Sequence, residues 1–224
     1  MDAKKQYNKN GKKYILAQEK LFAKKLDPAN DFIMKVLPKK TEGLMVLDFG
    51  CGHGKTINLL RKKKFRAVFG IDCSKAMIAE AQKNLQSGKN LFVANIEKTP
   101  FKNNFFDVVI SRFALHYLKN FDKAYTEINR ILKKGGSFVF VIDHPFRDLS
   151  WSKSQKYGQQ EIIDIKLYAG KITITFPTHT LSDYFSKIFQ KYFYMDAVLE
   201  GHSPEAHMDK FHSPDYLAIK AVKR

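Results

Sequence analysis

The feature that most constrains this chain is the alternation of short apolar runs with amphipathic stretches between residues 44 and 143. The runs are LMVLDF, RAVFGID, NLFVA, FDVVIS and SFVFVID, and helical patterns lie between them near 56–63, 75–85 and 121–132. Short continuous apolar runs are typical of strands buried on both faces, and strands that alternate with helices require crossover connections. The sequence therefore predicts a doubly wound α/β domain with a mostly parallel sheet.

Helical patterns also precede this region. Residues 14–26 form an amphipathic pattern that we expect Pro28 to end, and a short helix over 32–37 is expected to end at Pro38. We therefore expect a single domain over 1–224, made of an amino-terminal helical arm (1–40), a core (41–143), an insertion (144–180) and a closing segment (181–224).

The chain carries no recognisable targeting or membrane signal. Its start, MDAKKQYNKNGKKY, has no apolar run behind it, and no segment approaches the roughly 18 apolar residues of a membrane span. Its two cysteines do not resemble a disulfide framework. We expect a cytoplasmic protein with reduced thiols and no membrane partner.

The net charge of +17 raises the question of a nucleic-acid partner. However, 33 of the 39 basic residues are lysines, whereas arginine is the side chain that forks onto phosphates and guanines. The lysines are also spread over almost every segment. The composition leaves nucleic-acid binding open but favours a solvated basic surface.

The segment VLDFGCGHGKT, residues 46–56, ends like a phosphate-binding loop. That loop needs four residues between its first glycine and the Gly-Lys pair, but only three separate Gly50 from Gly54. The dinucleotide pattern G-x-G-x-x-G fails as well, because Lys55 stands in place of its third glycine. What remains is a D-x-G-x-G-x-G turn that does not require a phosphate.

This turn resembles motif I of the class I S-adenosylmethionine-dependent methyltransferases. Asp72, at the end of the second strand, NIEKTPF (95–101), and the FDVVISRFALHYL and LKKGGSFVFVIDHP segments resemble the later motifs of that family, in the same order. The resemblance covers nearly the whole chain. It implies a Rossmann-like sheet of seven strands with an antiparallel last strand, and S-adenosylmethionine as the cofactor.

The resemblance also implies which residues hold the cofactor. Asp72 is expected to bind the ribose diol, and Asp48 to orient the glycine turn or meet the ammonium of the cofactor. The expected set is Tyr14, Asp48, Gly50, Cys51, Gly52, Gly54, Asp72, Cys73, Met77, Asn95, Ile96 and Ser111. Asn95 departs from the aspartate that most relatives carry there, and core packing is the alternative role for Met77 and Ile96.

The sequence gives fewer indications of the residues that bind the methyl acceptor. Methyl transfer is an in-line displacement in which positioning and exclusion of water can dominate, so a general base is optional. His116 and His144 follow parallel strands and are candidate bases, although either can instead be a structural histidine that bonds the backbone. The expected acceptor-side residues are Tyr7, Phe113, His116, His144, Trp151 and Tyr157.

Residues 161–176 predict a β-hairpin with a two-residue turn at Ala169-Gly170. The apolar pairs of one face are Leu167 with Ile172, Ile165 with Ile174, and Ile163 with Phe176. An apolar face of this kind must be buried, so we expect a lid over the pocket, with a dimer contact as the alternative.

The closing segment predicts a helix capped by Thr180 and two final strands, MDAVLE and DYLAIKAVK. His202, His207 and His212 are spaced by five, which does not stack ligands on one helix face, so we expect no metal site.

The sequence favours a monomeric or homodimeric methyltransferase that acts on an O, N or C nucleophile of a small molecule. An RNA- or protein-directed methyltransferase and a non-catalytic cofactor-binding protein are the alternatives.

Overall fold

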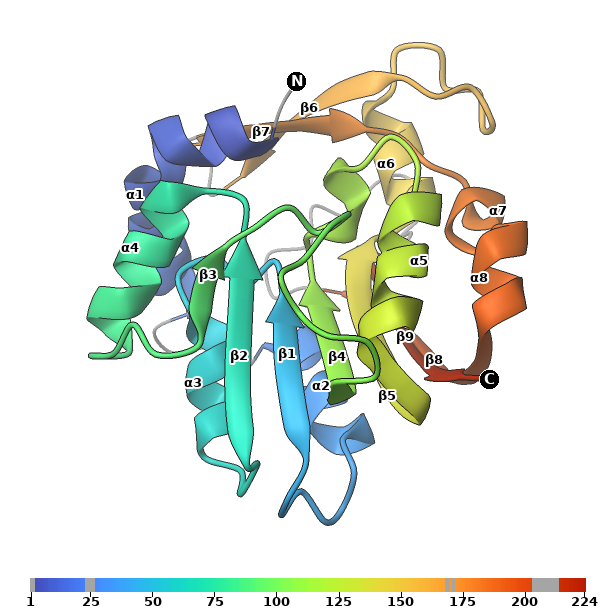
Figure 1. The fold of residues 1–224 in the computed structure, drawn as a ribbon. Coiled ribbons are helices and arrows are strands. Elements are labelled where there is room, and N and C mark those ends of the chain that lie inside the picture. Colours follow the sequence, from blue (N-terminus) through green and yellow to red (C-terminus); the bar gives the residue numbers. More distant parts are fainter. Residues whose placement is uncertain (1–2, 23–26, 168–169, 171, 203–213) are drawn as a thin grey trace.

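A computed structural model describes residues 3–22, 27–167, 170, 172–202 and 214–224. A seven-stranded sheet with the order β3-β2-β1-β4-β5-β9-β8 forms its centre, and β6 pairs with β7 in a separate hairpin (Figure 1). The strands are β1 (Met45–Phe49), β2 (Ala67–Asp72), β3 (Leu91–Val93), β4 (Phe106–Arg112), β5 (Leu132–Asp143), β6 (Ile162–Leu167), β7 (Ile172–Pro177), β8 (Phe193–Gly201) and β9 (Tyr216–Lys223). Strands β1 to β5 pair in parallel, and β9 runs antiparallel to β5 and β8. The predicted seven-stranded α/β fold is confirmed.

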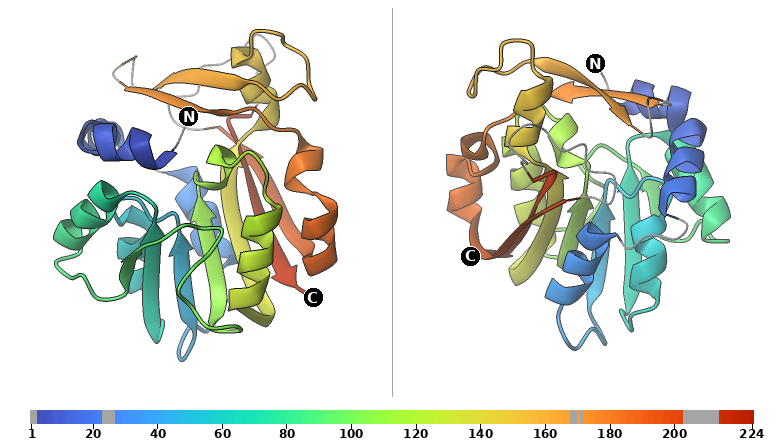
Figure 2. Two further views of the ribbon diagram at one scale, coloured as in Figure 1. Left: turned by 45° about the horizontal axis from the view of Figure 1, so that its top comes forward. Right: turned by 180° about the vertical axis from the view of Figure 1, so that it is seen from behind.

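Helices cover both faces of the sheet, α2 and α3 on one and α5 and α8 on the other (Figures 1 and 2). The helical elements are α1 (Ala3–Phe22), α2 (Pro28–Val36), α3 (Lys55–Arg61), α4 (Lys75–Asn84), η1 (Leu115–Tyr117), α5 (Asp122–Ile131), α6 (Pro145–Trp151), α7 (Leu181–Tyr184) and α8 (Lys187–Tyr192). Consecutive strand residues face opposite layers: Val46 packs in the cluster under α2, whereas Leu47 packs in the cluster under α5. Burial on both sides explains why these strands appear as unbroken apolar runs.

The amino-terminal arm differs from the sequence prediction at its boundaries. Helix α1 begins at Ala3, not near residue 14, and Pro28 is the first residue of α2 instead of the end of α1. Asp27 caps α2 through its carboxylate, which accepts from the N–H of Asn30. Proline is favoured at the first helical position because an N–H at that position would have no partner within the helix.

The predicted hairpin register is confirmed. Ile163 pairs with Phe176, Ile165 with Ile174, and Leu167 with Ile172. Ala169 of the expected turn and its neighbours Tyr168 and Lys171 lie outside the described residues. The apolar face is buried against α1 and η1, where it contacts Tyr14, Ala17 and Tyr117. This face is therefore covered within the same chain.

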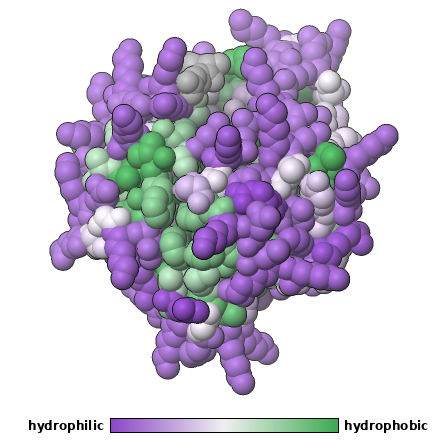
Figure 3. All heavy atoms as spheres, in the orientation of Figure 1, coloured by the Kyte–Doolittle hydropathy of each residue, from purple (hydrophilic) through white to green (hydrophobic). Residues whose placement is uncertain are grey.

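The segment between β3 and β4 contains no helix, and aromatic side chains pack together in this area of the sheet. Phe69 packs edge-on against Phe101 and Phe105, and Phe92 does so against Phe101. Phe92 and Val93 are exposed, and Figure 3 shows apolar surface in this area. Within the residues that the structure describes, no helix is long and apolar enough to cross a membrane.

Candidate active site

A cavity of about 530 Å³ opens at the carboxyl ends of β1, β2 and β4. The strand order reverses between β1 and β4, which is where open α/β sheets bind ligands. The volume lies within the range of small-molecule sites. Helix α1 and the β6–β7 hairpin both lie over these strand ends (Figures 1 and 2).

The glycine turn after β1 forms the floor of the cavity. Gly50 has φ +91°, and a Cβ built on it would lie 2.4 Å from the Cβ of Ala114. The N–H groups of Gly50 and Cys51 donate to the carbonyl of Ile71 at 2.9 and 2.8 Å. Only glycine fits at this position, since the backbone is left-handed and the loop after β4 packs directly on it.

Asp72, at the end of β2, ties two loops together at the wall of the cavity. Its carboxylate accepts from the N–H of Gly52 at 2.9 Å and from the N–H of Ser74 at 2.8 Å. Burial raises the pKa of Asp72, although these two backbone hydrogen bonds oppose the shift. Each carboxylate oxygen keeps a lone pair for a further donor.

Three polar side chains beneath the turn have buried atoms without hydrogen-bond partners among the described residues. They are Asp48, with both carboxylate oxygens, Ser111 with its hydroxyl, and Arg112 with its Nε. Burial, with a contribution from the charge of Asp72, raises the pKa of Asp48 to about 7, and Arg112 partly offsets the shift. Unpaired buried polar atoms are rare in folded proteins, so this place is suited to a polar ligand group.

A basic pair at the cavity wall was not predicted from the sequence. Arg112 Nη2 lies 2.7 Å from Asp27 Oδ2, and Lys55 Nζ lies 3.3 Å from the same oxygen. Lys55 and Thr56 begin α3 and line the cavity. The sequence did place Arg112 at the carboxyl end of a buried strand, which is the edge where such sheets bind ligands.

Three tyrosines close the cavity from above. The hydroxyls of Tyr7 and Tyr117 are 2.6 Å apart, and the ring of Tyr7 packs edge-on against Tyr14 and Tyr117. Asn8 anchors the arm at its other side, because its Oδ1 accepts from Ser74 Oγ at 2.8 Å and from the N–H of Ala76. Helix α1 is thus pinned to both η1 and α4.

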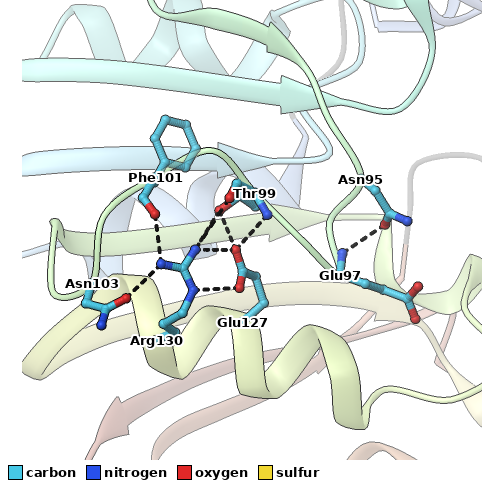
Figure 4. A network of polar contacts seen from close by, with 7 residues as sticks. All are labelled: Asn95, Glu97, Thr99, Phe101, Asn103, Glu127 and Arg130. Atoms are coloured by element: carbon cyan, nitrogen blue, oxygen red, sulfur yellow. Dashed lines mark hydrogen bonds and ion pairs between the residues drawn. The ribbon is translucent and has the colours of Figure 1, made fainter.

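The far end of the cavity is lined by Cys73, Met77, Asn95 and Ile96. Asn95 Oδ1 accepts from the N–H of Glu97 and so shapes its own turn (Figure 4). Further along the segment, Glu127 accepts from the N–H of Thr99, and Arg130 bonds the carbonyl of Phe101 at 2.8 Å (Figure 4). These contacts fix the segment against α5.

Most of the expected cofactor residues line this cavity, but three do not. Nine line it: Tyr14, Gly50, Cys51, Gly52, Asp72, Cys73, Met77, Asn95 and Ile96. Asp48 and Ser111 are buried just below, and Gly54 is the N-cap of α3, packed on Leu85. Of the expected acceptor-side residues, Tyr7 and Phe113 line the cavity.

The other four acceptor-side residues lie elsewhere. His144 caps α6: its Nδ1 accepts from the N–H of Phe146, and its Nε2 lies 2.8 Å from Glu200 Oε1. Both ring nitrogens are engaged by the protein, so we withdraw His144 as a candidate base. Trp151 and Tyr157 are exposed and do not line the cavity. His116 is buried behind Tyr117, at 4.4 Å between ring centroids.

In the described part of the chain, no group of three or more His, Cys, Asp or Glu side chains is arranged so that it could hold a metal ion. His202 is exposed, and His207 and His212 lie outside the described residues.

Comparison with known proteins identifies the family. A model of the methyltransferase domain matches residues 47–140. The methyltransferase YdaC of Bacillus subtilis, itself uncharacterised, is 31% identical over 128 residues, which cover 56% of this chain and 71% of that protein. The chain belongs to the class I S-adenosylmethionine-dependent methyltransferases.

Solved structures show the same fold. A proposed S-adenosylmethionine-dependent methyltransferase from Listeria monocytogenes has a TM-score of 0.69 at 23% identity, covering 88% of this chain and 98% of that one. A chain in the complex between the Haloferax volcanii Trm112 methyltransferase activator and a proposed methyltransferase has a TM-score of 0.71 at 18% identity, covering 99% and 97%.

The chain spans about half the length of the first curated relatives that it matches. An uncharacterised protein of Haemophilus influenzae is 32% identical over 139 residues, which are 57% of this chain and 54% of that protein.

The cavity suits the cofactor of the family, S-adenosylmethionine. The ribose diol needs an acceptor such as the Asp72 carboxylate, and the methionine ammonium needs an acid such as Asp48, whose carboxylate has no hydrogen-bond partner among the described residues. Gly50 has no room for a side chain because Ala114 packs on it, which holds together the two loops that line the cavity. The residues present therefore fit the group.

Proposed function

We propose that this chain transfers the methyl group of S-adenosylmethionine to an O, N or C nucleophile of a small molecule. The observation that carries the proposal is the roof of the cavity, where the Tyr7–Tyr117 hydrogen bond joins the amino-terminal arm to η1 above the glycine turn. An enclosed site excludes water and favours an acceptor small enough to be surrounded.

In this proposal the residues have two tasks, which are to bind the cofactor and to align it for the reaction. Asp72 holds the ribose, Asp48 and Arg112 meet the ammonium and carboxylate of the methionine part, and Cys73 with Met77 packs on the adenine. The bound cofactor supplies a methyl group on a sulfonium, which is the electrophile. The protein contributes alignment: Gly50 lets the cofactor lie against the backbone, and the tyrosine roof keeps water from the reacting carbon.

A second candidate is a methyltransferase that acts on RNA or protein, favoured by the net charge of +17. The similarity to a chain from an activator complex of Haloferax volcanii adds the prospect of a protein partner. The location and the oligomeric state, for which we propose a cytoplasmic monomer or homodimer, stay predictions, as does the role of the hairpin as a lid.

One experiment separates these candidates. The purified chain is titrated with S-adenosylmethionine by calorimetry, and formation of S-adenosylhomocysteine is then measured with a small-molecule acceptor library and with tRNA at increasing salt. We expect cofactor binding, turnover with small molecules, and only weak tRNA binding that fades with salt. Turnover on tRNA alone would favour the second candidate, and absence of cofactor binding would refute both.

Cofactor affinity should depend on pH through Asp48. Burial raises the pKa of this carboxyl to about 7, so it is protonated below pH 7 and cannot pair with an ammonium. Because only the ionised fraction is competent, the apparent Kd should rise about twentyfold from pH 7.5 to pH 5.5. Calorimetric titrations at a series of pH values test this. Asp48→Asn should bind more weakly at pH 7.5 and show a flatter profile, and an unchanged profile in that variant would contradict the role of Asp48.

A further inference from the structure

Helix α1 presents a polar and aromatic side to the cofactor cavity. Tyr7, Tyr14 and Gln18 recur at helical spacing along α1, so they lie on one side of the helix, and all three line the cavity. Gln18, the last of them, is only 4% exposed. A buried amide that faces a ligand cavity is a candidate for a direct contact with the ligand.

The protein leaves the amide of Gln18 incompletely hydrogen-bonded. Its Nε2 donates to the hydroxyl of Tyr14 over 3.4 Å, which is longer than usual, and its Oε1 is buried with no partner among the described residues. Native interiors satisfy nearly all such atoms. Because Gln18 lines the cavity, a ligand bound there can supply the missing hydrogen bond.

A second buried glutamine of α1 has a different surrounding. Gln6 is 5% exposed, and its Oε1 accepts from the N–H of Thr175 at 2.9 Å, which ties α1 to β7. Its Nε2 has no partner among the described residues, but Gln6 does not line the cavity. Only Gln18 of this pair can therefore reach a ligand in the cavity.

The position of Gln18 along α1 indicates which part of the cofactor it meets. Nearer its start, α1 contacts α4: Asn8 Oδ1 accepts from Ser74 Oγ, and Gly11 packs on Met77. This is the side of the cavity that we assign to the adenine. Gln18 lies two turns beyond Gly11, about 10 Å further along the helix axis.

The chemistry at the other side of the cavity suits an amino-acid group. The chain continues from α1 to Asp27, whose carboxylate bonds both Arg112 and Lys55. Asp48 lies beneath the glycine turn with both carboxylate oxygens unpaired among the described residues. An acid and a base together suit a zwitterion. The amide of Gln18 suits the same group, because an amide can accept from an ammonium and donate to a carboxylate.

Helix α1 depends on contacts with the rest of the fold, because it is a weak helix by itself. Its first turn contains no acidic residue, and Lys4 and Lys5 lie at the positive end of the helix dipole. Gly11 in its interior lowers its stability further. An additional contact at Gln18 would therefore hold α1 more firmly over the cavity.

We propose that Gln18, with the hydroxyl of Tyr14, binds the amino-acid end of the cofactor and thereby locks α1 over the occupied site. This inference rests on the proposed function and adds a residue that distinguishes the complete cofactor from its adenosine part. Asp48 and Arg112 hold the amino-acid group from the side of the sheet, and Gln18 holds it from the arm. A ligand without that group leaves Gln18 unsatisfied and α1 less firmly held.

The first test compares two ligands that differ only at this end. S-adenosylhomocysteine carries the amino-acid group, whereas methylthioadenosine has the same nucleoside and sulfur without it. We expect Gln18→Met, which keeps the size of the side chain but removes the amide, to weaken S-adenosylhomocysteine binding about tenfold to a hundredfold in calorimetric titrations. Its affinity for methylthioadenosine should stay within about twofold of the parent, which also shows that the variant is folded.

Two further variants complete the binding test. Gln6→Met is the matched control, because Gln6 is an equally buried glutamine of the same helix that does not line the cavity. Any effect of this control should be the same for both ligands. Tyr14→Phe removes the hydroxyl beside Gln18 and should reduce the preference for S-adenosylhomocysteine in the same direction, which gives a second result if Gln18→Met does not fold.

The second test measures the opening of α1 by limited digestion with trypsin, which cuts at the lysines of this helix. At saturating concentrations, S-adenosylhomocysteine should slow cleavage within α1 at least about threefold more than methylthioadenosine does. In Gln18→Met the two ligands should protect α1 equally.

Three results would overturn the inference: an unchanged affinity of Gln18→Met for S-adenosylhomocysteine, an equal loss of affinity for both ligands, or full protection of α1 in that variant. The first is also the result expected if Gln18 binds the methyl acceptor instead. If the parent chain does not bind S-adenosylhomocysteine at all, the proposed function itself fails, so the two failures can be told apart.

Discussion

Replacing Gly50 with alanine should abolish measurable binding of S-adenosylmethionine. The new Cβ would lie 2.4 Å from the Cβ of Ala114, and φ is +91°, in the region that L-residues avoid. The backbone alone costs about 1–2 kcal/mol, and relief of the overlap must move either the glycine turn or the loop after β4. Both loops line the cavity, so we expect affinity to fall at least about a hundredfold and unfolding free energy to fall by about 2–4 kcal/mol.

Gly43→Ala provides a matched control for this experiment. Gly43 has φ +81°, but a Cβ there would meet nothing within 4 Å. The control variant should lose about 1 kcal/mol of stability, measured by urea unfolding, and should bind the cofactor as the parent does. If calorimetry gave Gly50→Ala the same cofactor affinity as Gly43→Ala, the close approach at Gly50 would have no role in binding.

Asp72→Ala should have an effect of similar size on the cofactor. The carboxylate already organises the cavity wall by accepting from Gly52 and Ser74, and in our proposal it also accepts from both ribose hydroxyls. Hydrogen bonds to a charged group contribute about 1.5–3 kcal/mol each, so loss of the pair should weaken binding by a factor between about a hundred and about twenty thousand. Adenosine carries the same ribose, so its affinity should fall by a similar factor, because the lost hydrogen bonds are those to the sugar.

The Asp107→Ala variant is the control that distinguishes a loss of ribose binding from a general loss of stability. Asp107 also accepts from a backbone N–H, that of Met45 at 2.8 Å, and bonds Lys133 at 2.7 Å. It lies at the amino end of β4, away from the cavity. This control should be destabilised in thermal unfolding yet bind the cofactor normally. An Asp72→Ala protein that is folded and keeps its affinity for adenosine would refute the assignment.

The strands and the hairpin register follow from local pattern because successive side chains of a strand point to opposite faces. An apolar run such as LMVLDF is buried on both faces, and Ile163 pairs with Phe176 as the matching alternation of apolar and polar residues in the two hairpin segments predicts. Helix α1 was harder to delimit. Its first turns contain Asn8, Asn10 and Gly11, which are poor helix formers. Gly11 lies where a Cβ would come 3.3 Å from Met77, so contact with α4 explains it.

The sequence alone determined the parallel sheet, the glycine turn and the position of Asp72 at the end of a strand, because each depends on residues that are close in the chain. The glycine turn also requires a backbone conformation that few other residues adopt. Only the tertiary structure decided which side chains complete the site. The salt bridge from Asp27 to Arg112 spans 85 positions, and the Tyr7–Tyr117 hydrogen bond spans 110. His144 looked like a base beside the sheet edge, yet the fold uses it to cap α6. Contacts across such distances depend on how layers pack, and no local pattern records them.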